Sequence, residues 1–202
     1  MVFFGHAGIA LGAAVVLNGL LARPIENEPA KSDEPSSRLA APWRSAEAWV
    51  VSLGQRFDLR LLLLGSIVSD IVDKPAGRLF YGTFGCRLFC HSLMFLLIVA
   101  LAGLYLYLSR HKNWLLVMAF GVFTHLALDE MWLDTRTFLW PAYGFSFPTV
   151  ERSEWAEGVL HRLFTSPKVY VPELLGLVVI VWIAWLLVHR GKVYAFIRHG
   201  QI

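Results

Sequence analysis

Long apolar stretches separated by shorter polar ones dominate the pattern of the chain. A helix that crosses a bilayer needs about 20 mainly apolar residues. Four stretches come near that length. A fifth, Leu59–Val72, is shorter, or it extends back through the amphipathic run Ala46–Phe57. We therefore predict an all-α, polytopic integral membrane protein with about five hydrophobic helices plus amphipathic interfacial helices. The four longer stretches are Phe3–Ala22, Ser92–Ser109, Trp114–Leu133 and Glu173–Val188.

Two polar connections are long enough to carry structure of their own. Residues 23–45 are rich in proline and serine, which favours a polar loop. Residues 46–57 are amphipathic and predict an interfacial helix, for which Trp43 and Trp49 are suitable anchors. Residues 134–172 form the second connection, predicted as an outer loop with aromatic side chains at the membrane surface. We expect one membrane domain over residues 1–202.

Composition supports a membrane protein and excludes several other classes. Hydrophobic residues make up 56% of the chain and charged residues only 16%. That apolar share exceeds the roughly 45–50% of soluble domains and is inconsistent with a disordered chain. A net charge of +3 is too small and too dispersed for a nucleic-acid surface, so we expect no nucleic-acid partner. Membrane lipids are the expected partners. Nothing in the sequence indicates an oligomeric state.

The distribution of Lys and Arg orients the predicted helices. With five spans, one side carries 11 of these residues, in the loop Arg23–Arg60, in the turn Arg110–Lys112 and in the C-terminal tail. The other side carries 7. Because cytoplasmic loops are enriched in positive charge, we expect the N-terminus outside and the C-terminus inside, in a plasma (inner) membrane.

Ionisable residues near the predicted spans all fall at one depth. Such groups are costly inside a membrane, so each needs a functional or structural reason. Alternating helices place the start of one span beside the end of the next. The residues at these positions therefore share one membrane face, which the charge count makes extracytoplasmic. They are His6, Asp70, Asp73, His91, His125, Asp129 and Glu173.

Local spacing suits a metal site. Asp70 and Asp73 are three residues apart and His125 and Asp129 four, so each pair shares a helix face. Arg87 is likewise four residues before His91, on the same helix face if that helix starts early. Mixed imidazole and carboxylate ligands suit several divalent metals, and their number is sufficient for a two-metal site. Two simpler interpretations stay open. Single histidines can bond between helices, and the Asp73-Lys74-Pro75 segment can be a helix terminus.

Several short blocks resemble a known family, the YdjM-like membrane-bound metal-dependent hydrolases, and most closely its archaeal-type members. The first block is Gly5-His6. The others are Gly65-Ser-Ile-Val-Ser-Asp-Ile-Val-Asp-Lys-Pro75, Arg87-Leu-Phe-Cys-His-Ser-Leu93, His125-Leu-Ala-Leu-Asp129 with Met131-Trp132, Trp140-Pro141 with Gly144, and Pro172-Glu-Leu-Leu-Gly176. The resemblance covers most of the chain. Ser69 stands where the family usually has proline. Cys86 stands where many members have histidine or glycine, and it is a possible soft ligand.

The resemblance implies a polytopic metal-dependent hydrolase. The His-x-x-x-Asp pair is similar to that of zinc-dependent phospholipase C. The implied cofactor is about one to three divalent ions, zinc first, with Mn, Fe or Mg as alternatives. The implied metal ligands are His6, Asp70, His91, His125 and Asp129, with Asp73 and Glu173 as second choices.

We expect hydrolysis of a phosphoester, of lipid headgroup type, by metal-activated water at the membrane interface. Asp73 or Glu173 is the expected general base, and Arg87 the expected partner of a phosphate oxygen. The same residues also suit a metal-ion or proton transporter, although the chain shows no inverted repeat. A non-catalytic structural metal site is the third possibility.

Overall fold

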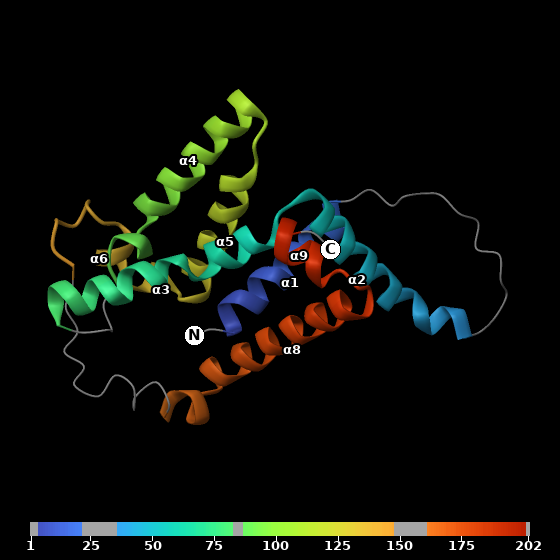
Figure 1. The fold of residues 1–202 in the computed structure, drawn as a ribbon. Coiled ribbons are helices and arrows are strands. Elements are labelled where there is room, and N and C mark those ends of the chain that lie inside the picture. Colours follow the sequence, from blue (N-terminus) through green and yellow to red (C-terminus); the bar gives the residue numbers. More distant parts are fainter. Residues whose placement is uncertain (1–3, 22–35, 83–86, 148–160, 201–202) are drawn as a thin grey trace.

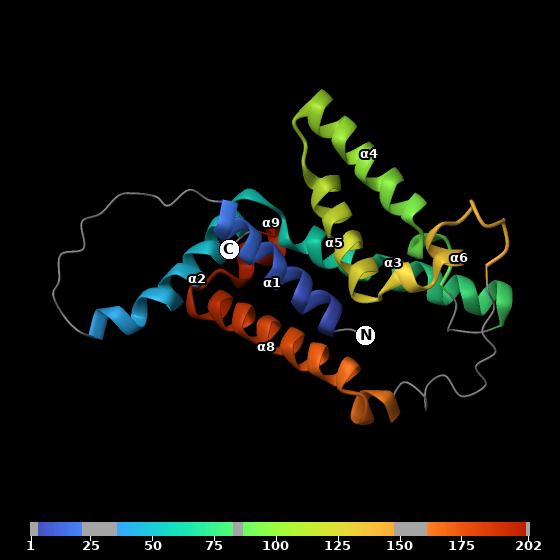
Figure 2. The ribbon, with the colours of Figure 1, turned by 180° about the vertical axis from the view of Figure 1, so that it is seen from behind.

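The described part of the chain is built from helices and contains no strand. The structure, a computed structural model, describes residues 4–21, 36–82, 87–147 and 161–200. The predicted all-α class is therefore confirmed (Figures 1 and 2). The longer helices are α1 (Phe4–Leu21), α2 (Ser36–Arg56), α3 (Leu59–Tyr81), α4 (Leu93–Arg110), α5 (Trp114–Leu128) and α8 (Pro167–His189). Shorter elements are η1 (Phe89–His91), η2 (Met131–Leu133), α6 (Thr135–Phe138) and α9 (Val193–His199).

Two of the described helices, α4 and α8, are long and apolar enough to cross a membrane. Helices α1 and α5 are apolar but shorter. Helix α3 is long but carries charged side chains in its second half, among them Asp70, Asp73 and Lys74. The five hydrophobic spans expected from the sequence are therefore not confirmed as a set, because α1 and α5 are short and α3 is charged.

Glycines bring two pairs of helices into close contact. Gly65 on α3 faces Gly121 on α5, and Gly8 on α1 faces Gly176 on α8. A side chain on Gly65 would meet the backbone of α5, and one on Gly176 would meet the backbone of α1. Small residues of this kind let helix backbones approach within a membrane. The two crossings lie close to the predicted ligands in the sequence, so they fix where those ligands meet.

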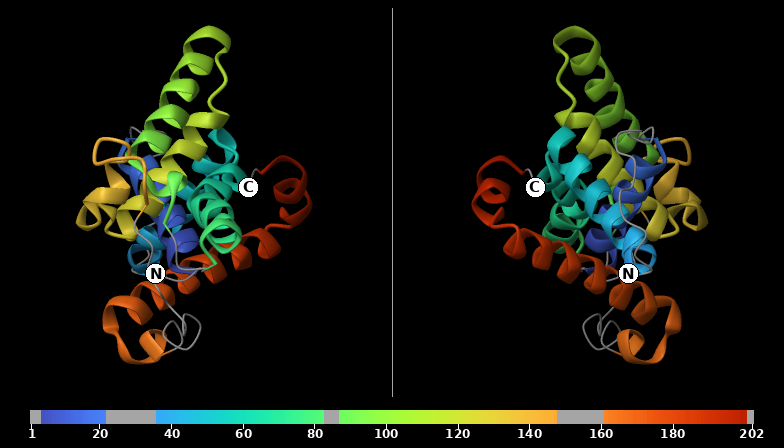
Figure 3. Two further views of the ribbon diagram at one scale, coloured as in Figure 1. Left: turned by 90° about the vertical axis from the view of Figure 1, so that its left-hand side faces the viewer. Right: turned by 90° about the vertical axis from the view of Figure 1, so that its right-hand side faces the viewer.

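The hairpin of α4 and α5 leans away from the other helices toward its tip, as seen in Figures 1 and 3. Helix α4 packs on α5 and η1. Its outer side presents large apolar side chains, including Leu101, Tyr105 and Leu108, each more than 60% exposed. An apolar surface of this extent suits contact with lipid rather than with water.

Helices α2 and α3 differ from the sequence-based expectation. Helix α2 begins at Ser36, so residues 36–45 are helical rather than part of a polar loop. Residues 23–35 lie outside the described residues. Helix α3 is separate from α2, because Asp58 caps its N-terminus by accepting a hydrogen bond from the Arg60 amide at 3.0 Å. The helix then continues through Pro75 and ends at Gly82, whose φ of 72° is left-handed. The helix terminus expected at Pro75 is therefore wrong.

The segment after α5 is also more structured than a loop. Helix α5 ends at Leu128, not at Leu133, because Glu130 takes a left-handed conformation with φ 52°. Asp134 then caps α6, and its side chain accepts a hydrogen bond from the Thr137 hydroxyl at 3.0 Å. Helix α8 starts at Pro167, before the expected Glu173. The predicted loop 134–172 is thus shortened at both ends, and residues 148–160 lie outside the described residues.

The C-terminal helix α9 is held against the start of α3. The Arg60 guanidinium pairs with Asp58 at 2.6 Å and donates to the Ile197 carbonyl at 2.8 Å. The Leu59 amide donates to the Gly200 carbonyl at 3.1 Å. The hydrogen bond from Arg60 lowers the pKa of the Asp58 carboxyl below its ordinary value. These contacts hold the C-terminal helix at the start of α3, on the side away from the candidate ligands.

Candidate metal centre

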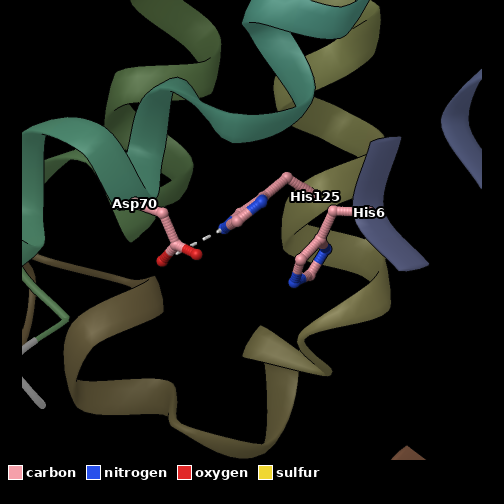
Figure 4. Close-up of side chains that lie close together, drawn as sticks. All are labelled: His6, Asp70 and His125. Atoms are coloured by element: carbon pink, nitrogen blue, oxygen red, sulfur yellow. Dashed lines mark ion pairs between the residues drawn. The ribbon is translucent and has the colours of Figure 1, made fainter. Parts of the chain in front are cut away.

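Three imidazoles and two carboxylates converge near the start of α1 and the end of α5, beside the middle of α3. His6 comes from α1, Asp70 from α3, His91 from η1 and His125 from α5, and Asp129 follows α5 directly. They form two overlapping groups, His6–Asp70–His125 and His91–His125–Asp129, with potential ligand atoms within 4.8 Å of one another in each. Figure 4 shows the first group, with its three side chains directed toward a common point. The structure thus brings together the five predicted ligands, and their binding of a metal stays a prediction.

Hydrogen bonds made by the Nδ1 atoms of His91 and His125 set the tautomers of these two rings. Nδ1 of His125 donates to the Ser66 carbonyl at 2.7 Å, and Nδ1 of His91 donates to the Asp73 carboxylate at 2.7 Å. In the neutral rings, the Nε2 atoms therefore carry lone pairs, and these atoms lie only 3.3 Å apart. Two nitrogens at roughly 2.0–2.1 Å from one tetrahedral zinc ion would lie about 3.3 Å apart. The pair therefore fits a shared cation.

His6 provides a second test of whether the residues fit a metal. Its side chain is 1% exposed, and neither ring nitrogen has a hydrogen-bond partner among the described residues. Nε2 lies 3.2 Å from Asp129 Oδ1, and the ring packs on His125 with centroids 4.2 Å apart. Buried polar atoms without partners are rare and need an explanation. A metal ion held by His6 and its neighbours supplies one.

The two carboxylates divide their oxygens between the imidazoles and basic side chains. Oδ1 of Asp70 lies 3.6 Å from His91 Nε2 and 4.0 Å from His125 Nε2. Its Oδ2 lies 2.6 Å from Lys74 Nζ. Oδ1 of Asp129 lies 3.2 Å from His6 Nε2, while Oδ2 lies 3.2 Å from the Arg87 guanidinium and 4.0 Å from His91 Nε2. The basic side chains are 36% and 40% exposed, so they mark the edge of the cluster that solvent reaches.

Asp73 lies behind His91 and is fully engaged by donors. Its Oδ2 accepts from the His91 ring at 2.7 Å, the Leu88 amide at 2.8 Å and the His91 amide at 3.2 Å. Its Oδ1 accepts from the Cys90 amide at 3.2 Å. A carboxylate that binds the outer nitrogen of a ligand histidine fixes the orientation of the ring. The geometry gives Asp73 a positioning role, whereas the sequence suggested a general base or a ligand.

The carboxylates make the region around His91 favourable for positive charge. Burial alone lowers the pKa of a histidine, but hydrogen bonds to Asp70 and Asp73 outweigh it and raise the pKa of His91 above its ordinary value. A proton and a metal ion therefore compete for the same nitrogen. The cluster attracts a cation in either case.

Glu173 is buried at the start of α1 rather than within either ligand group. Its side chain is 7% exposed, and Oε2 accepts from the Gly5 amide at 3.1 Å. Free amides at a helix N-terminus favour a carboxylate. The contact comes from α8, three residues before the Gly176 crossing, and it fixes the residue preceding His6. The expected role of Glu173 as a base stays a prediction.

The residues around η1 differ from the expected helical arrangement. Arg87 precedes η1 in irregular structure, so it and His91 do not share a helix turn as the spacing suggested. Its guanidinium reaches Asp129 instead. Cys86 lies outside the described residues. Cys90 is buried, and burial raises the pKa of its thiol to about 12, so it is a neutral packing group.

Sequence reasoning missed three contributors to the site. Lys74 could have been found, because it follows Asp70 by one helical turn and opposite charges at that spacing pair readily. The Gly65–Gly121 contact had only a weak signal, since single glycines occur in many helices. The Ser66 carbonyl that orients His125 had no signal, because any residue offers the same backbone group.

The comparisons with known proteins agree with this arrangement. A family model described as YdjM inner membrane protein matches residues 1–193, which include all five candidate ligands. No curated protein and no solved structure gave a match. The match spans nearly the whole chain, and the apolar helices and the His/Asp cluster lie within it. We conclude that the chain is a membrane protein that belongs to the YdjM inner membrane protein family.

Proposed function

We propose that the chain is a membrane-embedded, metal-dependent hydrolase that cleaves a phosphoester of a lipid headgroup. One observation carries the proposal. The carboxylates of Asp70 and Asp129 each lie against the imidazoles and also pair with a partly exposed basic side chain. Cationic donors at the edge of a metal site suit an anionic substrate such as a phosphate ester.

The metal would be held by His6, Asp70, His91, His125 and Asp129. Because His125 belongs to both ligand groups, the arrangement suits two neighbouring ions as well as one. Mixed nitrogen and oxygen ligands make zinc the first candidate, with manganese, iron and magnesium as alternatives. A bound divalent ion supplies a water of lowered pKa and polarises the phosphoryl group.

The chain's own residues bind and orient the substrate in this proposal. Arg87 can grip a phosphate oxygen with its planar guanidinium, and Lys74 adds a second positive charge at the edge of the site. Asp73 keeps the His91 ring in place through Nδ1. Glu173 is our candidate proton acceptor, because its buried carboxylate accepts a hydrogen bond from the amide of Gly5, the residue before His6.

The membrane position supports a lipid substrate. We propose that α1, α3 and α5 cross the bilayer together with the longer α4 and α8, as the apolar pattern predicted. The cluster then lies near the start of α1 and the end of α5, where a headgroup meets its side chains while the acyl chains stay in the bilayer. The helix ends on the other side carry Arg110 and Arg190, so the cluster belongs on the extracytoplasmic face.

The proposal is tested with the purified protein in mixed micelles of phospholipid, loaded with zinc or manganese. Release of a phosphorylated headgroup or of phosphate is followed by mass spectrometry. We expect turnover by the wild type and none by His125→Ala, which removes the residue shared by both ligand groups. We expect Arg87→Ala to keep its metal and to lose about tenfold or more in kcat/KM.

The control for Arg87→Ala is Arg78→Ala, since Arg78 is also basic but donates to the Gly82 carbonyl at the end of α3. It should hydrolyse lipid at the wild-type rate. A protein that binds metal but releases no product from any phospholipid would contradict the hydrolase proposal. Metal-dependent flux across liposomes by that same protein would favour the transporter alternative.

A further inference from the structure

A cavity of about 610 Å³ lies at the end of the helices opposite the metal centre. Helices α1, α2, α3, α4 and α5 all contribute to its lining, which is mainly apolar and includes Ala14, Leu17 and Leu116. None of the five candidate ligands lines the cavity, and Phe120, the lining residue of α5 nearest to His125, lies five residues or roughly 8 Å from it along the helix. The cavity is therefore separate from the ligand cluster.

The position of the cavity gives it access to the bilayer. It is lined by Tyr107 near the end of α4 and by Asn113 at the start of α5, the region where this hairpin leans away from the remaining helices (Figures 1 and 3). The adjoining face of α4 presents exposed apolar side chains such as Leu104 and Leu108. An apolar chain from the lipid can therefore enter the cavity without crossing water.

One charged side chain lines this cavity. Arg56 is exposed, and its guanidinium has no hydrogen bond or ion pair with any described residue. The polar amides beside it are engaged, since Asn113 donates to the Arg56 carbonyl at 3.4 Å and Asn18 donates to the Trp49 carbonyl at 3.1 Å. The cavity thus combines apolar walls with a single available positive charge.

The surroundings of the cavity add to that charge. The last turns of α2, α4 and α9 carry Arg56, Arg110 and Arg198, and Lys112 follows α4. Basic pockets between membrane helices on the cytoplasmic side attract anionic lipid headgroups. We propose that this cavity binds an anionic phospholipid, with an acyl chain along its apolar walls and the phosphate at Arg56.

Other occupants match these features less well. A volume of about 610 Å³ lies within the roughly 300–1,000 Å³ of small-molecule pockets, so part of one lipid can fill it. A soluble anion would pair with Arg56 but leave the apolar walls against water. A neutral lipid would cover the walls but leave the guanidinium without an anionic partner. An anionic amphiphile satisfies both parts.

The test measures lipid retained by the full chain in detergent, using native mass spectrometry. The protein is incubated with equal amounts of phosphatidylglycerol and phosphatidylcholine. We expect the wild type to retain phosphatidylglycerol preferentially. Arg56→Gln should reduce that preference about fivefold, the contribution of one basic residue near an anionic lipid. Arg78→Gln removes a charge at the far end of α3, away from the cavity, and should retain the wild-type preference.

A second variant tests the apolar walls. Leu17 lines the cavity and is 43% exposed, so Leu17→Trp adds volume there without disturbing a tightly packed position. It should reduce retention of both lipids, whereas Leu20→Trp, on the same helix but outside the lining, should not. Equal retention of the two lipids by the wild type would overturn the proposal. So would equal lipid preferences of Arg56→Gln and Arg78→Gln, or equal lipid retention by the two tryptophan variants.

Discussion

Replacing Asp73 by Asn would test the positioning role of this buried carboxylate. Three backbone amides and the His91 ring donate to its two oxygens. An asparagine side chain has the same shape but only one acceptor oxygen. Its NH2 group must therefore face at least one of these donors, or donate to Nδ1 of His91. In the second case the ring proton moves to Nε2, the nitrogen that faces the cluster.

The expected effect is a loss of metal affinity with the helices intact. Removing the outer partner of a ligand histidine typically weakens metal binding by roughly 10–100-fold. At a metal concentration 100 times the wild-type Kd, bound metal stabilises the folded protein by about 2.7 kcal/mol. A variant with 100-fold weaker binding would gain only about 0.4 kcal/mol under the same conditions. Most of the metal-dependent stability should therefore disappear.

Thermal unfolding with and without a chelator, followed by circular dichroism in detergent, measures this difference. The matched control is Asp58→Asn, which makes the same Asp-to-Asn change at a carboxylate that also accepts a hydrogen bond from a backbone amide. Asp58 lies at the N-terminus of α3, away from the candidate ligands. It should keep the wild-type response to chelator. If Asp73→Asn responds to chelator as the wild type does, with equal metal content, then the His91–Asp73 contact does not position a ligand and the reasoning fails.

Further predictions concern helix contact, pH and the α1 N-terminus. Gly121→Leu should separate α3 from α5 and lower metal content, with a destabilisation of about 1–3 kcal/mol, whereas Gly12→Ala, which meets only ordinary contacts, should match the wild type in unfolding and metal analysis. The pKa of Asp58 in the folded protein is lowered below its ordinary value of 3.8. The contribution of this carboxylate to folding stability is therefore present above pH 3.8 and is lost as the pH falls below that value. Asp58→Asn should therefore show a smaller loss of melting temperature on acidification, and an unchanged loss would contradict this. Metal affinity measured by chelator competition should fall as pH drops through neutrality, because the raised pKa of His91 makes protons competitive; pH-independent affinity would exclude that competition. Glu173→Ala should weaken metal binding less than His6→Ala, since it acts on His6 only through the Gly5 amide. Equal losses would instead place Glu173 among the ligands.

The convergence of the candidate ligands could be predicted because it depends only on the alternation of helices. His6 begins one helix and His125 ends another, so the two meet whatever the details of packing. The helix boundaries were harder to predict. Pro75 suggested a helix terminus, yet α3 continues through it until Gly82 provides a left-handed residue. Asp129 was expected inside a helix but follows it, because the backbone turns at Glu130.

The division of roles among the carboxylates could not be predicted. In the sequence Asp70 and Asp73 are equivalent, three residues apart before a lysine and a proline. Only the path of the chain after α3 separates them, since it brings the amides of η1 to Asp73 and leaves Asp70 facing the imidazoles. Long-range backbone placement of this kind has no local signature in the sequence.

The origin of the candidate ligands in four separate segments, α1, α3, η1 and the end of α5, has a consequence for biosynthesis. His6 lies in the first segment to leave the ribosome, while its neighbours at Asp129 and Glu173 belong to segments that follow much later. Because the N-terminal part of a chain is synthesised first, the early helices enter the membrane while the site is still incomplete. In the proposed metalloprotein, an ion can therefore be bound by the complete site only after the later helices are inserted and packed, and a chain interrupted before α5 lacks two of the candidate ligands.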